Sequence, residues 1–155
     1  MNHSAIRPLR RDDLSHVGHL VDANAMFPSS MLEEMTAPYF DTPSADQHWL
    51  VHDAEGVDGV AYFVPEPLTD GSWNLLLIAV DPDRHGAGIG TALMRHVEHL
   101  LRERRQRLLL VETSGVPAFE RTRRFYDKLG YEREACIRDY YTTGDDKIVF
   151  RKLIG

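Results

Sequence analysis

One segment, from Ile78 to Met94, constrains this chain more than any other part of its sequence. It begins as an apolar run that ends at Val80, as a buried strand would, and a short polar turn follows. Glycines then occupy alternate positions at Gly86, Gly88 and Gly90, after which the apolar spacing becomes that of a helix. A turn of this kind exposes several backbone N–H groups at the positive end of a helix dipole. It therefore predicts a binding site for a ligand that carries phosphate.

The spacing of the glycines excludes two common nucleotide-binding turns. A P-loop ends in Gly-Lys followed by Ser or Thr, and no such ending follows Gly90. The dinucleotide-binding fingerprint requires Gly or Ala three residues after its second glycine. When the pattern starts at Gly86 this position holds Thr91, and when it starts at Gly88 the position holds Leu93. A glycine-rich turn with no ligand is the alternative that stays open.

The residues of the turn resemble motif A of the GNAT superfamily of N-acetyltransferases, which reads Gln/Arg-x-x-Gly-x-Gly/Ala after a strand ending in Val-x-Pro. Here the motif reads His85-Gly86-Ala87-Gly88-Ile89-Gly90, preceded by Val80-Asp81-Pro82. The resemblance implies that the amides of the turn hold the pyrophosphate of acetyl-CoA, the co-substrate, and that the preceding strand hydrogen-bonds the pantetheine arm. The implied cofactor-binding residues are Ile78, Ala79, Val80, His85, Gly86, Ala87, Gly88, Ile89, Gly90 and Thr91. His85 stands where Gln or Arg is usual. Because the loop works mainly through main-chain donors, we expect the side chain of His85 to matter less than the glycine amides.

The apolar periodicity predicts an α/β chain. Strands are expected over residues 6–9, 49–52, 57–64, 73–80, 108–113, 131–137 and 147–153. Asp12 or Asp13 is expected to cap the first helix, and Ser30 with Glu33 forms a capping-box pattern for the second. The third helix follows the glycine turn, and the fourth is expected from Pro117 to Leu129.

This order of elements matches the GNAT acyl-CoA N-acyltransferase fold, which the resemblance implies. We expect a mixed central sheet of about six or seven strands flanked by about four helices. No linker, repeat or low-complexity segment interrupts the chain, so residues 1–155 are expected to form a single domain.

Composition limits the classes of function. The chain has no run of the ~20 apolar residues that a membrane span needs, and its first residues lack the apolar core of a signal peptide. The single cysteine, Cys136, fits a reducing cytoplasm and is expected to be a small buried hydrophobe in its strand. The histidines are scattered without metal-ligand spacing, so no metal site is expected. A formal net charge of -6 argues against nucleic acid as a partner.

The distribution of charge says more than its total. No Lys or Arg occurs from Asp12 to Asp83, whereas basic residues outnumber acidic ones from Arg84 onward. A basic half suits an anionic cofactor with several phosphates, and an acidic half suits a cationic amine acceptor. Both halves being ordinary solvated surface is the alternative.

Acetyl transfer from a thioester to an amine needs no covalent nucleophile, but it needs a proton acceptor for the ammonium and a proton donor for the departing thiolate. Arg124 to Tyr131 resembles the GNAT segment Phe-Tyr-x-x-x-Gly-Phe/Tyr, which implies that Tyr126 is the general acid. The alternative is that Tyr126 continues the apolar stripe of its helix. Many relatives carry Asn and Ala where this chain has Phe119 and Thr122, which puts the usual Asn contact with the cofactor in doubt.

Glu112 is the candidate base. It ends an apolar run, where a carboxylate is unfavourable unless it is paired or lies at the open end of a strand. The enzymes that acetylate the N-terminal alanine of ribosomal proteins have a Glu at the matching position, and this likeness implies that Glu112 accepts the proton, directly or through a water. Alternatively, Glu112 bonds to backbone or pairs with an Arg. Tyr140 and Tyr141 resemble the paired tyrosines that border the acceptor in those enzymes, or they pack a hairpin.

The sequence thus predicts a cytoplasmic, acetyl-CoA-dependent N-acetyltransferase that works by direct attack in a ternary complex. Its acceptor would be a small-molecule amine or a peptide N-terminus, with no nucleic acid or membrane as partner, and a homodimer stays open. Two rival functions are an acyltransferase with another acyl-CoA or a hydroxyl acceptor, and a CoA-binding sensor or interaction module without turnover.

Overall fold

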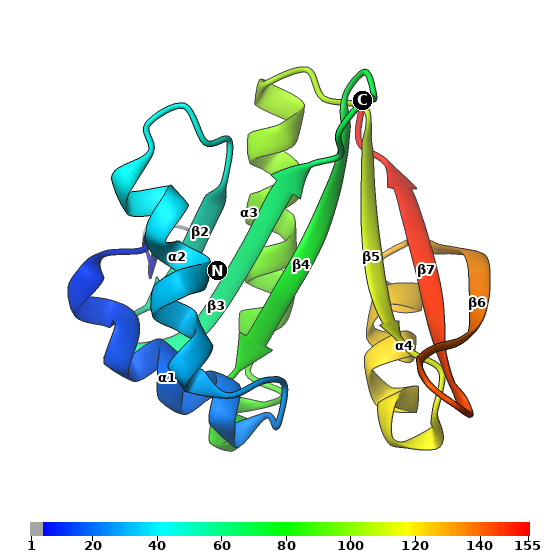
Figure 1. Ribbon diagram of the computed structural model, residues 1–155, viewed down its shortest axis with the longest axis horizontal. Coiled ribbons are helices and arrows are strands. Elements are labelled where there is room, and N and C mark those ends of the chain that lie inside the picture. Colours follow the sequence, from blue (N-terminus) through cyan, green and yellow to red (C-terminus); the bar gives the residue numbers. More distant parts are fainter. Residues whose placement is uncertain (1–4) are drawn as a thin grey trace. The chain divides into compact units, whose positions relative to one another are not determined.

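The computed structural model describes residues 5–155, which contain four α-helices and a sheet of seven strands (Figure 1). The helices are α1 (Leu14–Ala23), α2 (Leu32–Asp41), α3 (Ile89–Glu103) and α4 (Glu120–Lys128). The strands are β1 (Ile6–Pro8), β2 (His48–Asp53), β3 (Val57–Pro65), β4 (Ser72–Val80), β5 (Leu108–Ser114), β6 (Glu132–Thr142) and β7 (Asp145–Leu153). The predicted α/β class and the expected numbers of strands and helices are confirmed.

The sheet has the strand order β1-β2-β3-β4-β5-β7-β6. It is mixed, because β4 and β5 run parallel, whereas the neighbours β1–β2, β2–β3, β5–β7 and β6–β7 are antiparallel. The chain divides into two compact units. The first unit extends to Pro65 and also includes Leu76–Leu100, and the second comprises Glu66–Leu75 and Leu101–Gly155. Whether the two units form the single domain expected over residues 1–155 stays a prediction.

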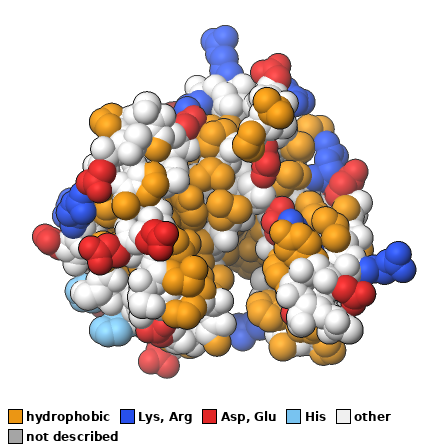
Figure 2. Space-filling model, in the orientation of Figure 1, with side chains coloured by type: hydrophobic (Ala, Val, Ile, Leu, Met, Phe, Trp, Pro, Cys, Tyr) orange, Lys and Arg blue, Asp and Glu red, His pale blue; other side chains and the backbone are white. Residues whose placement is uncertain are grey.

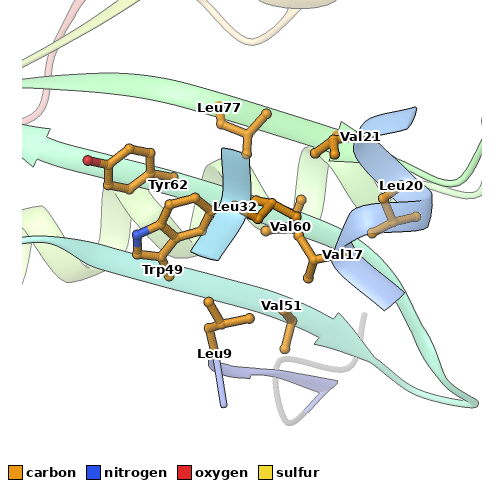
Figure 3. Packing of buried hydrophobic residues seen from close by; sticks show 11 residues of the cluster. Leu9, Val17, Leu20, Val21, Leu32, Trp49, Val51, Val60, Tyr62 and Leu77 are labelled. Atoms are coloured by element: carbon orange, nitrogen blue, oxygen red, sulfur yellow. The ribbon is translucent and has the colours of Figure 1, made fainter. Parts of the chain in front are cut away.

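The core of the first unit lies between its strands and the helices α1 and α2 (Figure 3). Val17, Leu20 and Val21 recur at helical spacing on α1 and are buried. They meet strand residues that include Val51, Val60 and Leu77, while the ring of Trp49 stacks on that of Tyr62 at a centroid distance of 4.1 Å. Each such buried aliphatic side chain stabilises the fold by about 1.5–3 kcal/mol. This packing fixes the end of β4, where the glycine turn begins.

The first helix begins differently from the prediction. A 3-10 turn covers Arg11–Asp13, and neither Asp12 nor Asp13 caps α1 through its side chain. The carboxylate of Asp13 instead accepts the backbone N–H of Arg10 at 2.7 Å and both terminal nitrogens of Arg7 at 2.8 and 2.9 Å. The guanidinium of Arg7 lowers the pKa of Asp13. Asp13 therefore ties β1 to the start of α1.

The capping box predicted at Ser30 and Glu33 is wrong. Ser29–Met31 forms a 3-10 turn, α2 begins at Leu32, and the N-cap residue of neither element makes a side-chain capping bond. The first turn of α2 keeps its acidic residues, which interact favourably with the positive end of the helix dipole.

The second unit contains the start of β4 together with β5, β7, β6 and α4. β6 is the edge strand, and all of its residues are exposed. Cys136 lies on β6, so the prediction that it is buried is wrong. Alternation of apolar residues does not distinguish an edge strand from a central one, which explains the error. Within residues 5–155, no helix is long and apolar enough to cross a membrane.

Candidate functional site

The glycine turn of the first unit has the predicted strand–turn–helix form. After Val80 a 3-10 turn covers Pro82–Arg84, and α3 begins at Ile89. Gly86 and Gly88 adopt φ angles of +87° and +83°, which only glycine adopts without strain. Nothing lies within 4 Å of the place where a Cβ would stand on either residue, so the turn is open at both positions. The first turn of α3 holds no acidic residue that would oppose an anion.

The start of α3 packs closely on β3, because a glycine faces it. A Cβ on Gly59 would lie 2.9 Å from Cγ2 of Ile89 and 3.0 Å from Cδ1 of Leu93, so any larger residue would push the helix away. Ile89, Leu93 and Val97 are buried, as the predicted apolar face requires. The position of the N-terminus of α3 is thus set by the core.

Side chains hold the turn at its entrance. The carbonyl oxygen of Val80 lies 3.0 Å from Nδ2 of Asn24 and 3.0 Å from Nε2 of His85. The next amide, Asp81 N–H, donates to the carbonyl oxygen of Asp58 at 2.9 Å. The end of β4 is therefore bonded to the last turn of α1, to β3 and to the motif itself. Sequence reasoning missed Asn24, because its position after α1 carries no local signal for a contact with Val80.

A charged group supports the turn from β3. The carboxylate of Asp58 is 8% exposed and lies 2.6 Å from Nδ1 of His52 and 3.7 Å from a guanidinium nitrogen of Arg84. Arg84 ends the 3-10 turn and is exposed. Its ion pair with Asp58 links the 3-10 turn to β3.

Tyr126, the predicted general acid, lies on α4 in the second unit and is 3% exposed. Its ring contacts those of Phe125, Tyr131 and Phe150 at centroid distances of 5.3, 6.0 and 5.4 Å. Burial raises the pKa of Tyr126, so the phenol keeps its proton at neutral pH. A protonated phenol is able to donate to a thiolate. The same burial suits a side chain that only packs, so its catalytic role stays a prediction.

The helix that carries Tyr126 begins later than expected. Pro117–Phe119 forms a 3-10 turn, and α4 starts at Glu120. The buried guanidinium of Arg123 donates to the carbonyl oxygens of Ser114 and Val116 at 2.7 and 3.0 Å. It thereby anchors the helix to the end of β5. Phe119 is 42% exposed.

Glu112, the predicted base, belongs to a polar cluster on the sheet of the second unit. Its carboxylate lies 2.9 Å from Nζ of Lys147 on β7 and accepts from Nδ2 of Asn74 on β4 at 3.1 Å. The same Nδ2 donates to Oε1 of Glu66 at 2.9 Å. Glu112 therefore pairs with a lysine, whereas the sequence suggested an arginine as the alternative partner.

The β6–β7 hairpin adds aromatic residues to this cluster. Nζ of Lys147 lies 4.1 Å from the centroid of the Tyr140 ring, and Tyr140 contacts Tyr141 edge to face. Partial desolvation of its hydroxyl, followed by the negative charge of Glu112, raises the pKa of Tyr141. Asp139 lies where the pairing of β6 with β7 is irregular, between Ile137 and Thr142, and it adopts φ +55°. Its carboxylate accepts the N–H of Gly144 at 2.8 Å.

The predicted site residues divide between the units. The cofactor-binding residues from Ile78 to Thr91 lie in the first unit, and Glu112 and Tyr126 lie in the second. On the face shown in Figure 2, acidic and apolar side chains share the exposed surface over α1 and α2 of the first unit.

Across residues 5–155, no group of three or more His, Cys, Asp or Glu side chains is placed to hold a metal ion.

Comparisons with known proteins agree with the motif. A family model described as an acetyltransferase (GNAT) domain matches residues 44–133. An uncharacterized N-acetyltransferase of Methanocaldococcus jannaschii is 31% identical over 100 residues, which are 62% of this chain and 62% of that protein. The chain therefore matches less than two thirds of the length of this curated relative.

Solved structures match over nearly the whole chain. A protein assigned to the GNAT family, from Desulfovibrio desulfuricans, is 31% identical with a TM-score of 0.89, covering 97% of this chain and 99% of that one. The ribosomal-protein-S18-alanine N-acetyltransferase of Escherichia coli is 22% identical, with a TM-score of 0.77, and the match covers 97% of this chain and 93% of that one. An aminoglycoside 6'-N-acetyltransferase complexed with coenzyme A is 17% identical, with a TM-score of 0.79 over 97% of both chains. The last two show the fold alone.

Proposed function

This chain belongs to the GNAT acetyltransferase family, and on that premise we propose that it transfers an acetyl group from acetyl-CoA to a primary amine by direct attack. The observation that carries the proposal is the open glycine turn between β4 and α3. Gly86 and Gly88 leave open space beside the main chain just before the N-terminus of α3, and helix N-termini are favourable sites for anions. The family supplies the acyl-CoA that such a turn accommodates.

The residues of the turn fit the phosphates of acetyl-CoA. The open space at Gly86 and Gly88 leaves room for an oxyanion to reach the main chain. We assign the pyrophosphate to the amides of Gly86 and of Gly88 to Thr91, because the Ala87 N–H already donates to the carbonyl oxygen of Arg84 at 3.2 Å. We assign the pantetheine arm to the main chain of Ile78 to Val80. The side chain of His85 bonds to Val80 instead of reaching outward.

Tyr126 and Glu112 are the residues that we assign to proton transfer. The amine nitrogen attacks the thioester carbonyl carbon, so a C–N bond forms and the C–S bond breaks. The departing thiolate takes the proton of the Tyr126 phenol, which burial keeps in its protonated form. Before the attack the ammonium gives one proton to Glu112, directly or through one water, and the neutral amine is the nucleophile. The second proton, which the nitrogen loses as the amide forms, returns to the Tyr126 phenolate. Lys147 keeps the Glu112 carboxylate in place.

We propose a small cationic amine or a peptide N-terminus as the acceptor. The segment from Asp12 to Asp83 contains acidic residues but no Lys or Arg, and this balance of charge suits a cationic acceptor. The structurally similar Escherichia coli protein is an alanine N-acetyltransferase, so short peptides with a free N-terminus belong in the panel of acceptors to be tested.

A thiol-release screen tests the proposal. Amino acids, polyamines, aminoglycosides and short peptides are each incubated with the full chain and acetyl-CoA, and free CoA is measured. We expect at least one primary amine to release CoA in proportion to enzyme. Tight binding of acetyl-CoA without turnover on any amine would favour the sensor module. Faster turnover with another acyl-CoA or with an alcohol would favour the other rival.

A further inference from the structure

The side-chain amide of Asn74 donates two hydrogen bonds but accepts none from the described residues, and it has no role in the proposed reaction. Its side chain is 3% exposed, and its Nδ2 donates to two carboxylates, at 2.9 Å to Glu66 and 3.1 Å to Glu112. Its Oδ1 is buried and has no hydrogen-bond partner in the described chain. Exchanging the two amide atoms would set Oδ1 against both carboxylates, so the observed orientation is the favourable one. A buried acceptor without a donor is unfavourable by about 1–3 kcal/mol, and it indicates a group that binds there.

The charges of the cluster do not balance. Lys147 is 9% exposed, pairs with Glu112 at 2.9 Å and lies over the ring of Tyr140. Among the ion pairs of residues 5–155, none involves Glu66. Two carboxylates therefore share one ammonium group, and one negative charge is left over. The surplus belongs to Glu66, because the charge of Glu112 is already matched.

Glu66 is held in place by its backbone. Its N–H donates to the carbonyl oxygen of Ser72 at 2.8 Å, and its carbonyl oxygen accepts from Oγ1 of Thr69 at 2.9 Å. These bonds fix the turn that leads into β4. With Nδ2 of Asn74 on one oxygen, the carboxylate has a defined position and a free second oxygen.

We propose that Glu66 and Oδ1 of Asn74 bind the ammonium group of the acceptor. An ammonium carries three N–H donors and one positive charge. It therefore satisfies the unpartnered amide oxygen and the uncompensated carboxylate together. This inference rests on the proposed function, because it names the subsite that receives the acceptor. It makes the substrate class a primary amine that arrives as a cation, in preference to an alcohol.

A binding titration tests this assignment without turnover. The full chain is loaded with CoA, and the side-chain amide of Asn74 is followed by proton–nitrogen NMR during titration with butylammonium chloride or with butanol. We expect butylammonium to shift the resonance and to saturate, and butanol to have no such effect. Glu66→Gln should weaken butylammonium binding about tenfold, because a charge-assisted hydrogen bond is lost.

Glu120→Gln is the matched control. It removes the same charge from an exposed carboxylate of α4 that pairs with Arg124, and it should leave the affinity for butylammonium unchanged. Glu66→Asp keeps the charge at a shorter reach, and intermediate binding is expected. Equal responses to butylammonium and butanol would overturn the assignment, since Oδ1 would then accept any donor. Unchanged binding in Glu66→Gln would overturn it as well.

Kinetics separate this inference from the proposed function. With an amine that releases CoA, Glu66→Gln should raise the KM for the amine about tenfold while kcat changes little. Thiol release with an unchanged KM in this variant would contradict the ammonium subsite and leave the acetyltransferase proposal intact. Binding of butylammonium without turnover on any amine would support the subsite and contradict the proposed reaction.

Discussion

Nε2 of His85 lies 3.0 Å from the carbonyl oxygen of Val80, so the first residue of the glycine motif closes back on the strand that precedes it. Asn24 donates to the same oxygen. His85→Ala should weaken acetyl-CoA binding about two- to fivefold, because one neutral hydrogen bond contributes about 0.5–1.5 kcal/mol and Asn24 keeps the oxygen satisfied. Calorimetric titration with acetyl-CoA measures the change. His19→Ala, an exposed histidine of α1, serves as the control.

The double variant His85→Ala with Asn24→Ala should lose more affinity than the two single variants predict together. In this variant the carbonyl oxygen of Val80 has neither side-chain donor, and the entrance of the turn loses its link to α1. Strict additivity would show that the two donors do not act on one structural element.

The conformation of Gly88 gives a second prediction, which concerns the main chain. Gly88→Ala should weaken acetyl-CoA binding at least tenfold, because φ +83° strains an alanine and its Cβ fills the open turn. Gly144→Ala is the matched control, since Gly144 has the same φ and equally open surroundings in the β6–β7 hairpin. Both variants should lower the free energy of unfolding by about 1 kcal/mol. An equal loss of affinity from His85→Ala and Gly88→Ala would contradict the main-chain account.

The sequence predicted the glycine turn and the helices around it because their signals are local. Alternate glycines and apolar residues at helical spacing mark the N-terminus of α3 within a dozen residues. The partners of Glu112 carry no such signal. Lys147 comes beside Glu112 only because β7 pairs with β5 in the register Glu112↔Val149, and a shift of one residue would turn Lys147 to the other face.

Other errors have the same cause. The sequence predicts the carboxylate of Asp13 at a helix cap, but Arg7 on β1 forms a bidentate ion pair with it, which is stronger than a bond to a backbone N–H. The sequence predicts Cys136 in the core, but the edge position of β6, which exposes it, depends on the pairing of the whole sheet. Contacts set by tertiary structure decided each of these positions.

Tyr126→Phe is the third prediction. The change removes the phenol and keeps the aromatic packing, so acetyl transfer should fall about 10²-fold or more while thermal unfolding changes little. Because burial raises the pKa of Tyr126, its deprotonation cannot limit the rate in moderately alkaline solution. The wild-type rate should therefore show no alkaline decline below about pH 10, the ordinary pKa of tyrosine.

Tyr62→Phe is the control for this variant. Tyr62 is a buried tyrosine of β3 whose pKa is also raised by burial, and it lies outside the proposed proton-transfer residues. It should retain full activity. Full activity in Tyr126→Phe would contradict the assignment of Tyr126 as the general acid and would show that its side chain only packs.

The ion pair between Glu112 and Lys147 gives a prediction on stability. Burial, the largest single influence, would lower the pKa of Lys147, but the hydrogen bonds and negative charges of Glu112 and Tyr140 together outweigh it, and the pKa is raised. A lysine whose pKa is raised by folding stabilises the protein below its unfolded pKa of about 10.4, and this contribution is lost as the pH rises through the folded value. Glu112→Gln should therefore lower the free energy of unfolding by about 1–2 kcal/mol at pH 7, and the difference from wild type should shrink in more alkaline solution.

Urea unfolding at neutral and at alkaline pH measures the loss of stability and its dependence on pH. Glu120→Gln is the control, because it breaks the exposed ion pair between Glu120 and Arg124 and should change the free energy of unfolding by at most a few tenths of a kcal/mol. A difference that stays constant with pH would mean that Glu112 stabilises the sheet through its bond to Asn74 and not through the charge of Lys147.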